Sequence, residues 1–278
     1  MRKKILAYLM LYRADVAFIS FFCYLLGALF ADGLETLDLL VAFLVSIISL
    51  NFVYCINSWA DAQIDKINKP NRPMAKGIIK PKDALAYCSL LLALSLLWPY
   101  SVFGLSWHAH IFLVFPIGGL LYSVEPFRFK RNHILSLLLA SIVLILPLSS
   151  GYLVNRGSQT NVPYIFSIFL YALAILPLKD IEDVKGDSAF HCKNWFALLG
   201  RQKLLFYSLA VLLLNLCATL LMPATKAKIY VSVLIIGTMI IVAHFFFRQK
   251  SDIRLLYRQI ISFVMAYVFI SFASFYFL

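Results

Sequence analysis

Long apolar stretches alternate with short polar segments along the 278-residue chain. Nine of the apolar stretches approach the roughly 20 residues that an α-helix needs to cross a bilayer. Their approximate ranges are 16–31, 39–59, 84–103, 108–124, 134–154, 162–178, 204–222, 229–247 and 260–278. This pattern predicts an all-α membrane protein with nine transmembrane helices.

The composition excludes a water-soluble globular protein. Hydrophobic residues make up 62% of the chain and charged residues only 14%, far from the soluble average. A soluble chain of this composition would have to expose large apolar patches. We therefore expect a single domain over residues 1–278 that is embedded in the lipid bilayer.

The 25 Lys and Arg residues fall mainly in alternate connections between the predicted spans. The side that holds the N-terminus carries 22 of them, and the other side carries Arg156, Lys226 and Lys228. Basic residues favour the cytoplasmic side of membrane proteins. The distribution predicts a cytoplasmic N-terminus and, after nine crossings, a C-terminus on the opposite side. It also explains the net charge of +12 without a nucleic-acid partner.

Two groups of acidic residues follow predicted spans on the basic side. Asp61 and Asp65 come after the second span, and Asp180, Asp183 and Asp187 come after the sixth. Carboxylates at the membrane boundary are costly unless they have a partner. In contrast, we expect the acidic residues of the first outer loop to lie in a solvated turn without a chemical role. These are Asp32, Glu35 and Asp38.

The spacing places the carboxylates of each group on one helix face. Asn57, Asp61 and Asp65 recur at intervals of four residues, which a helix aligns in a row. The second group repeats this interval in Asp183 and Asp187, with Asp180 three residues earlier. Like charges at these intervals repel each other, so we expect a cation between them. Mg²⁺ fits best because it takes oxygen ligands and is usually held by one or two carboxylates plus substrate phosphates.

Basic residues on the same side complete a predicted phosphate site. They are Lys66, Lys69, Arg72 and Lys76 after the second span, and Arg128, Lys130 and Arg131 after the fourth. Carboxylates bridged by metal ions to a diphosphate, with Lys and Arg on its other oxygens, can stabilise diphosphate as a leaving group.

Three segments resemble signatures of the UbiA-type intramembrane prenyltransferases. The run from Asn57 to Pro73 is similar to the first aspartate signature, including the Asn-Lys-Pro and Arg-Pro steps that follow it. Residues 179–187 resemble the second signature, in the form found in homogentisate prenyltransferases, chlorophyll synthases and archaeal digeranylgeranylglyceryl phosphate synthases. Residues 121–131 resemble the tyrosine-and-basic loop after the fourth helix. One departure is Ser58, where many relatives carry an acidic or amide residue.

The resemblance implies nine transmembrane helices, in two four-helix sets plus one, around a central cavity with a cytoplasmic cap. The internal halves would be roughly residues 1–133 and 134–258, followed by the helix over 260–278. The family's roles imply two Mg²⁺ ions, one bound by Asn57, Asp61 and Asp65. The implied ligands of the second ion are Asp183 and Asp187, with Asp180 as an additional candidate.

The resemblance also implies which residues handle the diphosphate. Asn57, Arg72, Lys130 and Arg131 would bind it, and Tyr122 would lie near the ionising carbon. The implied catalytic set is Asp61, Asp65, Asp183, Asp187, Lys130 and Tyr122.

The implied activity moves a polyprenyl group from an isoprenoid diphosphate to a lipophilic or aromatic acceptor of the quinone type and releases diphosphate. Alternatives within the family are ether-lipid synthesis on a glycerol phosphate and terpene cyclisation. A secondary transporter would also have duplicated helical halves, but its coupling carboxylates would lie near the bilayer midplane. Here the acidic groups lie at one predicted surface.

Overall fold

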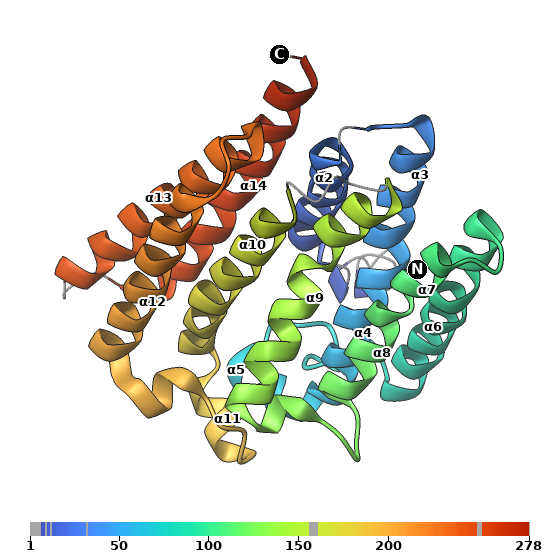
Figure 1. Ribbon diagram of the computed structural model, residues 1–278. Coiled ribbons are helices and arrows are strands. Elements are labelled where there is room, and N and C mark those ends of the chain that lie inside the picture. The colour runs from blue at the N-terminus through green and yellow to red at the C-terminus, as the bar shows by residue number, and fades with distance from the viewer. Residues whose placement is uncertain are drawn as a thin grey trace.

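The computed structural model describes residues 7–8, 10–11, 13–31, 33–155, 161–248 and 252–277, which form a helical bundle without strands (Figure 1). Some residues considered in the sequence lie outside the described residues. They are Arg2, Lys3, Lys4, Asp32, Arg156, Lys250 and Leu278.

The helices follow each other along the chain with short connections. The first part contains α2 (Ala14–Phe30), α3 (Thr36–Leu44), the π-helix η1 (Val45–Ser49), α4 (Leu50–Ala60), α5 (Ala62–Asn68), α6 (Pro81–Phe103), α7 (Trp107–Phe112), α8 (Val114–Ser123) and the 3₁₀-helix η2 (Phe129–Arg131). The second part contains α9 (His133–Val154), α10 (Val162–Ile175), the 3₁₀-helix η4 (Leu176–Glu182), α11 (Val184–Ala189), α12 (Trp195–Leu221), α13 (Lys226–Phe247) and α14 (Arg254–Phe277).

Among the described residues, seven helical runs are long and apolar enough to cross a membrane. One of them is Thr36–Ala60, which joins α3, η1 and α4, and another is Val162–Glu182, which joins α10 and η4. The others are α6, α9, α12, α13 and α14. The 17-residue α2 is a shorter apolar helix. The chain therefore has the helices of a multi-pass membrane protein, whereas a total of nine crossings stays a prediction.

The fourth predicted span, 108–124, is not one continuous helix. It consists of α7 and α8, which separate at Leu113. Pro116 lies in the first turn of α8 and has no N–H to donate to the carbonyl of Phe112, four residues earlier. The apolar pattern continues across this break, so hydrophobicity alone did not reveal it.

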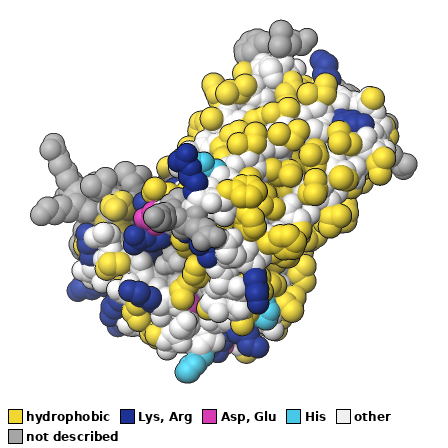
Figure 2. Space-filling view, turned by 90° about the vertical axis from the view of Figure 1, so that its left-hand side faces the viewer, with side chains coloured by type: hydrophobic (Ala, Val, Ile, Leu, Met, Phe, Trp, Pro, Cys, Tyr) yellow, Lys and Arg dark blue, Asp and Glu magenta, His cyan; other side chains and the backbone are white. Residues whose placement is uncertain are grey.

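The outer surface of the bundle suits a lipid environment. Figure 2 shows a broad area of apolar side chains on one face, with Lys and Arg mainly around its edges. Leu97, Phe206 and Ile240 are each 65% exposed. An apolar surface of this extent is unfavourable in water and favourable against lipid tails.

The short helices α5 and α11 lie side by side at one end of the bundle, and the C-terminus lies at the other end (Figure 1). The two parts of the chain have similar element orders. In each, a first helix is followed by a long helical run that leads into a short helix, α5 or α11. This order brings the acidic segments to the same end, although the proposed boundary between halves stays a prediction.

Glycines allow α2 and α9 to pack with their backbones in contact. A Cβ atom at Gly27 would lie 2.0 Å from the carbonyl oxygen of Leu148, and one at Gly151 would lie 2.1 Å from that of Tyr24. Neither atom fits without moving a helix. Small residues are therefore required at this crossing, as is common where membrane helices approach closely.

One expectation from the sequence is wrong at the C-terminal end of α9. Asp38 is not in a solvated turn, because its side chain is buried. Its carboxylate accepts hydrogen bonds from the hydroxyl of Tyr24 at 3.1 Å, from Nδ2 of Asn155 at 2.9 Å and from the backbone N–H of Glu35 at 2.8 Å. The carboxylate thus joins α2, α3 and the end of α9, while Glu35 remains exposed as expected.

We predict that Gly151→Ala destabilises the bundle because the new methyl group must push α2 and α9 apart. Overpacking of this kind costs about 1–3 kcal/mol, so the midpoint of thermal unfolding in detergent should fall. Gly33→Ala is the control, since its Cβ would lie 3.8 Å from Oδ1 of Asn155, an ordinary contact. Equal midpoints for Gly151→Ala and the wild type would contradict the close crossing.

Candidate active site

An aspartate lies at the bend between each long helical run and the short helix that follows it. Asp61 separates α4 from α5 with φ −94° and ψ 9°, and Asp183 separates η4 from α11 with φ −105° and ψ 0°. Active-site residues often occupy this sparsely populated backbone region. The expected continuous helix through residues 57–65 is therefore bent at Asp61.

Backbone hydrogen bonds between residues four apart continue after both bends. The backbone N–H of Asp65 donates to the carbonyl of Asp61 at 2.8 Å, and that of Asp187 donates to the carbonyl of Asp183 at 3.0 Å. Each short helix therefore carries its second aspartate one turn after the first. The two acidic segments are built in the same way.

The short helices are held together by the residues at the end of α5. Asn68 donates from Nδ2 to the carbonyl of Asp183 at 2.9 Å and accepts from the N–H of Gly186 at 2.6 Å. Lys69 forms an ion pair with Asp183, with 2.6 Å between Nζ and Oδ1. A Cβ at Gly186 would lie 2.6 Å from the side chain of Asn68, so only glycine allows this approach.

Lys130 connects the two acidic segments through its ammonium group. Its Nζ is hydrogen-bonded to Oδ2 of Asp61 and lies 3.8 Å from Oδ1 of Asp187. The side chains of both aspartates are less than 10% exposed. The structure thus brings the two groups together around the positive charge of Lys130.

The other predicted basic residues have different partners. Arg72 pairs with Asp65 at 2.6 Å, and Arg128 approaches Asp61 at 3.5 Å. Arg131 instead pairs with the exposed Glu125 at 2.9 Å, away from the aspartates. Among the described residues it forms no ion pair with either acidic segment.

Two further predicted site residues are Asn57 of α4 and Tyr122 of α8. Nδ2 of Asn57 is 3.5 Å from the hydroxyl of Ser123, which is a long contact. The hydroxyl of Tyr122 accepts a hydrogen bond from Ser136 of α9 at 3.2 Å. Neither residue is tied to a carboxylate by a hydrogen bond between described residues.

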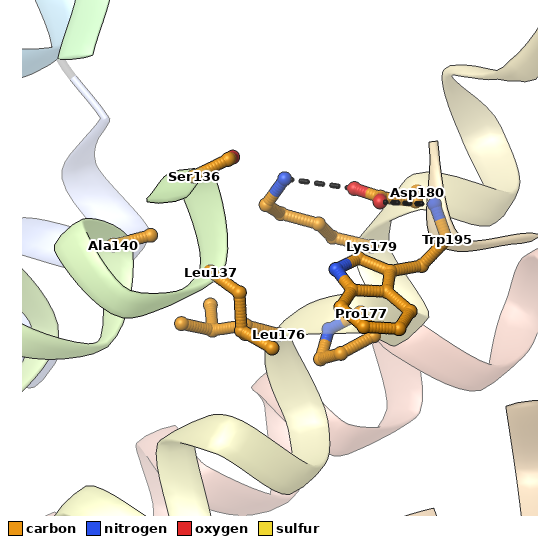
Figure 3. A pocket seen from close by; sticks show the side chains of 8 residues that line it. All are labelled: Ser136, Leu137, Ala140, Leu176, Pro177, Lys179, Asp180 and Trp195. Carbon is orange, nitrogen blue, oxygen red and sulfur yellow. Dashed lines mark hydrogen bonds and ion pairs between the residues drawn. The ribbon is translucent and has the colours of Figure 1, made fainter. Parts of the chain in front are cut away.

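Asp180 has a separate set of contacts. Its Oδ1 accepts from the ammonium of Lys179 at 2.9 Å, and its Oδ2 accepts from the backbone N–H of Trp195 at 3.0 Å (Figure 3). Asn194 donates to the carbonyl of Asp180 and to Oδ2 of Asp187, both at 3.0 Å. Asp180 therefore anchors the beginning of α12 through its Oδ2 and its backbone carbonyl.

Burial and ion pairing shift the pKa values of the charged groups in this site in opposite directions. Burial, opposed by Arg72, raises the pKa of Asp65, and burial, opposed by Lys130, raises the pKa of Asp187. At Asp183 burial also disfavours the charge, but Lys69, Lys179 and Lys130 together outweigh it and the pKa of Asp183 is lowered. Burial acts to lower the pKa of Lys130, but Asp61 outweighs it and the net shift is upward. Lys130 is therefore charged at neutral pH.

Comparison with known proteins identifies the family. Residues 20–276 match the model of the UbiA prenyltransferase family. The chain belongs to the UbiA prenyltransferase family.

Curated relatives in the UbiA family differ in how much of their length this chain spans. A probable homogentisate phytyltransferase 1 of chloroplasts from Oryza sativa subsp. japonica is 29% identical over 219 residues, which cover 72% of this chain and 52% of the rice protein. A digeranylgeranylglyceryl phosphate synthase from Thermococcus kodakarensis is 27% identical over 236 residues, which cover 82% of this chain and 81% of the archaeal protein. This chain spans about half the length of the plant relatives it matches.

A solved structure from the UbiA family has the same fold. A UbiA homolog from Archaeoglobus fulgidus, in a structure bound to DMAPP and Mg²⁺, superposes with a TM-score of 0.73. The two chains are 19% identical, and the match covers 96% of this chain and 99% of the other. The helical arrangement is therefore that of the UbiA family.

The donor atoms of this UbiA site fit a Mg²⁺ ion that is shared with a phosphate ligand. The buried Oδ1 of Asp187 accepts no hydrogen bond in the described part of the chain. Within that part, no three His, Cys, Asp or Glu side chains are grouped closely enough to hold a metal on their own. Mg²⁺ is usually held by one or two carboxylates together with waters and substrate phosphates. The aspartates at the two bends would supply this kind of partial coordination.

Sequence reasoning missed the roles of several residues that position the UbiA site. Asn68 and Asn194 act by hydrogen bonds to backbone and carboxylate groups, and Lys179 acts through Asp180. The signal for Asn68 was its place in the Asn-Lys-Pro step after the first acidic segment. Nothing in the local pattern around Asn194 indicated its second contact, to Asp187.

We predict that Asn68→Ala loosens α11, because it removes both contacts of this side chain with the second acidic segment. Leaving a partly buried hydrogen-bonding group without a partner costs about 1–3 kcal/mol. Hydrogen exchange of the amides in residues 184–189 should therefore become faster. Asn71→Ala, at an exposed position nearby, is the matched control. Unchanged exchange in Asn68→Ala would show that Asn68 does not hold the short helices together.

Proposed function

We propose that this protein is a Mg²⁺-dependent intramembrane prenyltransferase that moves a polyprenyl group from an isoprenoid diphosphate to a lipophilic or aromatic acceptor. The observation that carries this proposal is the contact of Lys130 with both Asp61 and Asp187. This contact brings two acidic segments and a positive charge together at one end of an apolar bundle. Such a site suits the charged head of a substrate whose hydrocarbon tail extends among the helices.

The proposed ligands are the residues with acidic or amide oxygens at the two bends. Asn57, Asp61 and Asp65 would hold one Mg²⁺, and Asp183 and Asp187 a second. We leave Asp180 out of this set because its Oδ2 accepts from the backbone N–H of Trp195 and so fixes the beginning of α12. When bound, Mg²⁺ would neutralise charge that develops on the departing diphosphate.

The basic residues of the site would bind the diphosphate oxygens. Lys130 and Arg72 each form an ion pair with an aspartate, and each has further N–H donors that can bind a phosphate group. Arg131, which contacts Glu125, would serve at the exposed edge of the site. These charges are in place before the substrate arrives, which lowers the cost of stabilising the leaving group.

In the proposed reaction, the allylic carbon–oxygen bond breaks and its electron pair leaves with the diphosphate. The acceptor then forms a bond to the allylic carbon and loses a proton. The ring of Tyr122 would lie beside the cationic carbon, where an aromatic face is favourable. The surrounding apolar helices would keep water from capturing the cation.

A second acceptor class has specific support. The archaeal digeranylgeranylglyceryl phosphate synthase matches this chain over 81% of its own length, whereas the rice homogentisate phytyltransferase matches over 52%. Ether-lipid synthesis on a glycerol phosphate is therefore the leading alternative to an aromatic acceptor. Terpene cyclisation at the same site would need no separate acceptor.

We predict that Asp61→Ala and Asp183→Ala each reduce prenyl transfer by at least about a hundredfold, because each removes charge that organises the leaving-group site. Purified protein in detergent would be given geranylgeranyl diphosphate, Mg²⁺ and a panel of acceptors, and products and diphosphate would be measured. Removing Mg²⁺ with EDTA should abolish the same activity. Asp83→Ala, at an exposed position in the first turn of α6, is the matched control.

Two outcomes would contradict the proposal. Near-normal rates in either aspartate variant with Mg²⁺ present would remove that residue from the metal site. Absence of diphosphate release from the wild type with every acceptor would argue against prenyl transfer and in favour of a transporter.

A further inference from the structure

The structure separates two kinds of basic residue between α5 and the first turn of α6. Lys69 and Arg72 pair with aspartates of the candidate active site. The other lysines of this stretch are exposed, and no ion pair joins them to a described residue. They are Lys66, Lys76, Lys80 and Lys82. Lys66 and Lys76 were predicted as part of the phosphate site, but they have no contact with its aspartates.

Three of these lysines lie within seven residues, at the point where the chain enters α6. This helix begins at Pro81 and is long and apolar enough to cross a membrane. Lys80 and Lys82 flank the proline, and Lys76 precedes it by five residues. The start of a membrane-spanning helix lies at the level of the lipid head groups, where basic residues are favoured. We call the exposed surface formed by Lys76, Ile78, Lys80 and Lys82 the basic rim.

The backbone of the basic rim is fixed on the bundle. The N–H groups of Lys76 and Ile78 donate to the carbonyls of Arg72 and Pro73 at 3.0 and 2.9 Å. Ile79 is only 2% exposed and belongs to the hydrophobic core between α4 and α6. The rim is therefore held in place before a ligand binds, and less conformational freedom is lost on binding.

An exposed apolar side chain lies among the lysines. Ile78 is 42% exposed and follows Gly77, where a φ of 70° turns the chain. At a bilayer surface such a side chain can contact acyl chains, while neighbouring lysines extend their ammonium groups to the head groups. This combination fits a lipid surface better than a nucleic acid or a soluble acidic protein.

The basic rim also has an excess of positive charge. The acidic residue that follows it, Asp83, is exposed in the first turn of α6 and forms no ion pair with a described lysine. Even when this charge is subtracted from the three lysines, two positive charges remain. Basic clusters beside a membrane-spanning helix attract lipids with a net negative head group.

We propose that the basic rim binds anionic phospholipids, with their phosphate groups at the lysines and their acyl chains beside Ile78. The inference does not rest on prenyl transfer, because the rim contains none of the residues proposed to bind Mg²⁺ or diphosphate. A lysine suits this ligand because its ammonium has three rotatable donors, which can reach a phosphodiester from different directions. Bound lipid would hold the beginning of α6 at the membrane surface.

The test compares two lipids that differ only in head group. Purified protein in a nonionic detergent would be titrated with phosphatidylglycerol or phosphatidylcholine carrying the same acyl chains. Native mass spectrometry would count the bound lipids and give dissociation constants at low and high ionic strength. The test variant is Lys76→Gln/Lys80→Gln/Lys82→Gln, and a second variant has Arg at the same three positions.

A matched control removes the same number of charges from three other exposed lysines, which follow the second acidic segment. It is Lys185→Gln/Lys193→Gln/Lys203→Gln. Thermal unfolding in phosphatidylcholine would be measured for each protein. Equal midpoints are expected, because all the substituted side chains are exposed.

We expect wild type to bind phosphatidylglycerol at least about tenfold more tightly than phosphatidylcholine at low ionic strength, because several lysines act at one surface. The preference should shrink at high ionic strength, since salt screens exposed charges. The Gln variant of the rim should lose most of the preference. The Arg variant and the control should keep it within about twofold, and binding of phosphatidylcholine should be similar in all four proteins.

Three results would overturn the inference. They are a wild type without preference for phosphatidylglycerol, a Gln variant of the rim that keeps the full preference, and a control that loses as much of it. A fourth concerns glycerophosphoglycerol, which is the same head group without acyl chains. If it displaced phosphatidylglycerol at equal concentration, the rim would bind a soluble anion instead of a lipid.

Discussion

The fold requires that carboxylates at helix ends, near the edge of the apolar bundle, are neutralised by cationic side chains. Asp61 and Asp187 come from segments more than a hundred residues apart, yet they share the ammonium of Lys130. Removing one member would leave a buried charge without a partner, which is far more costly than the loss of a surface ion pair. The same charges that permit this end of the protein to fold also prepare it for an anionic ligand.

The two acidic segments have the same local architecture. Each has an aspartate at a backbone bend and a second aspartate one turn later. The first segment is followed by Asn68, which contacts the second segment, whereas Asn194 after the second segment binds back to Asp180 and Asp187. The pKa shifts nevertheless differ in direction, because burial dominates at Asp65 and Asp187 and raises their pKa, whereas Lys69 and neighbouring lysines lower the pKa of Asp183. Similar local architecture thus gives chemically distinct carboxylates.

Hydrophobic periodicity predicted the all-helical fold and the positions of most long helices, because burial in lipid leaves a strong pattern in the sequence. That the two acidic segments share one site was implied by the resemblance to the UbiA signatures. The break at Leu113, the burial of Asp38 and the contacts of Asn68 were not predicted. These features depend on a single proline, on the packing of α9 over α3, and on bonds between side chains and distant backbone groups, none of which produces a periodic signal.

The glycine contact between α2 and α9 has a mechanical consequence. With a carbonyl oxygen of each helix seated against a glycine of the other, no compressible side chains lie between them at that point. The crossing is therefore a fixed point of the bundle, and any change in the distances between helices has to take place elsewhere.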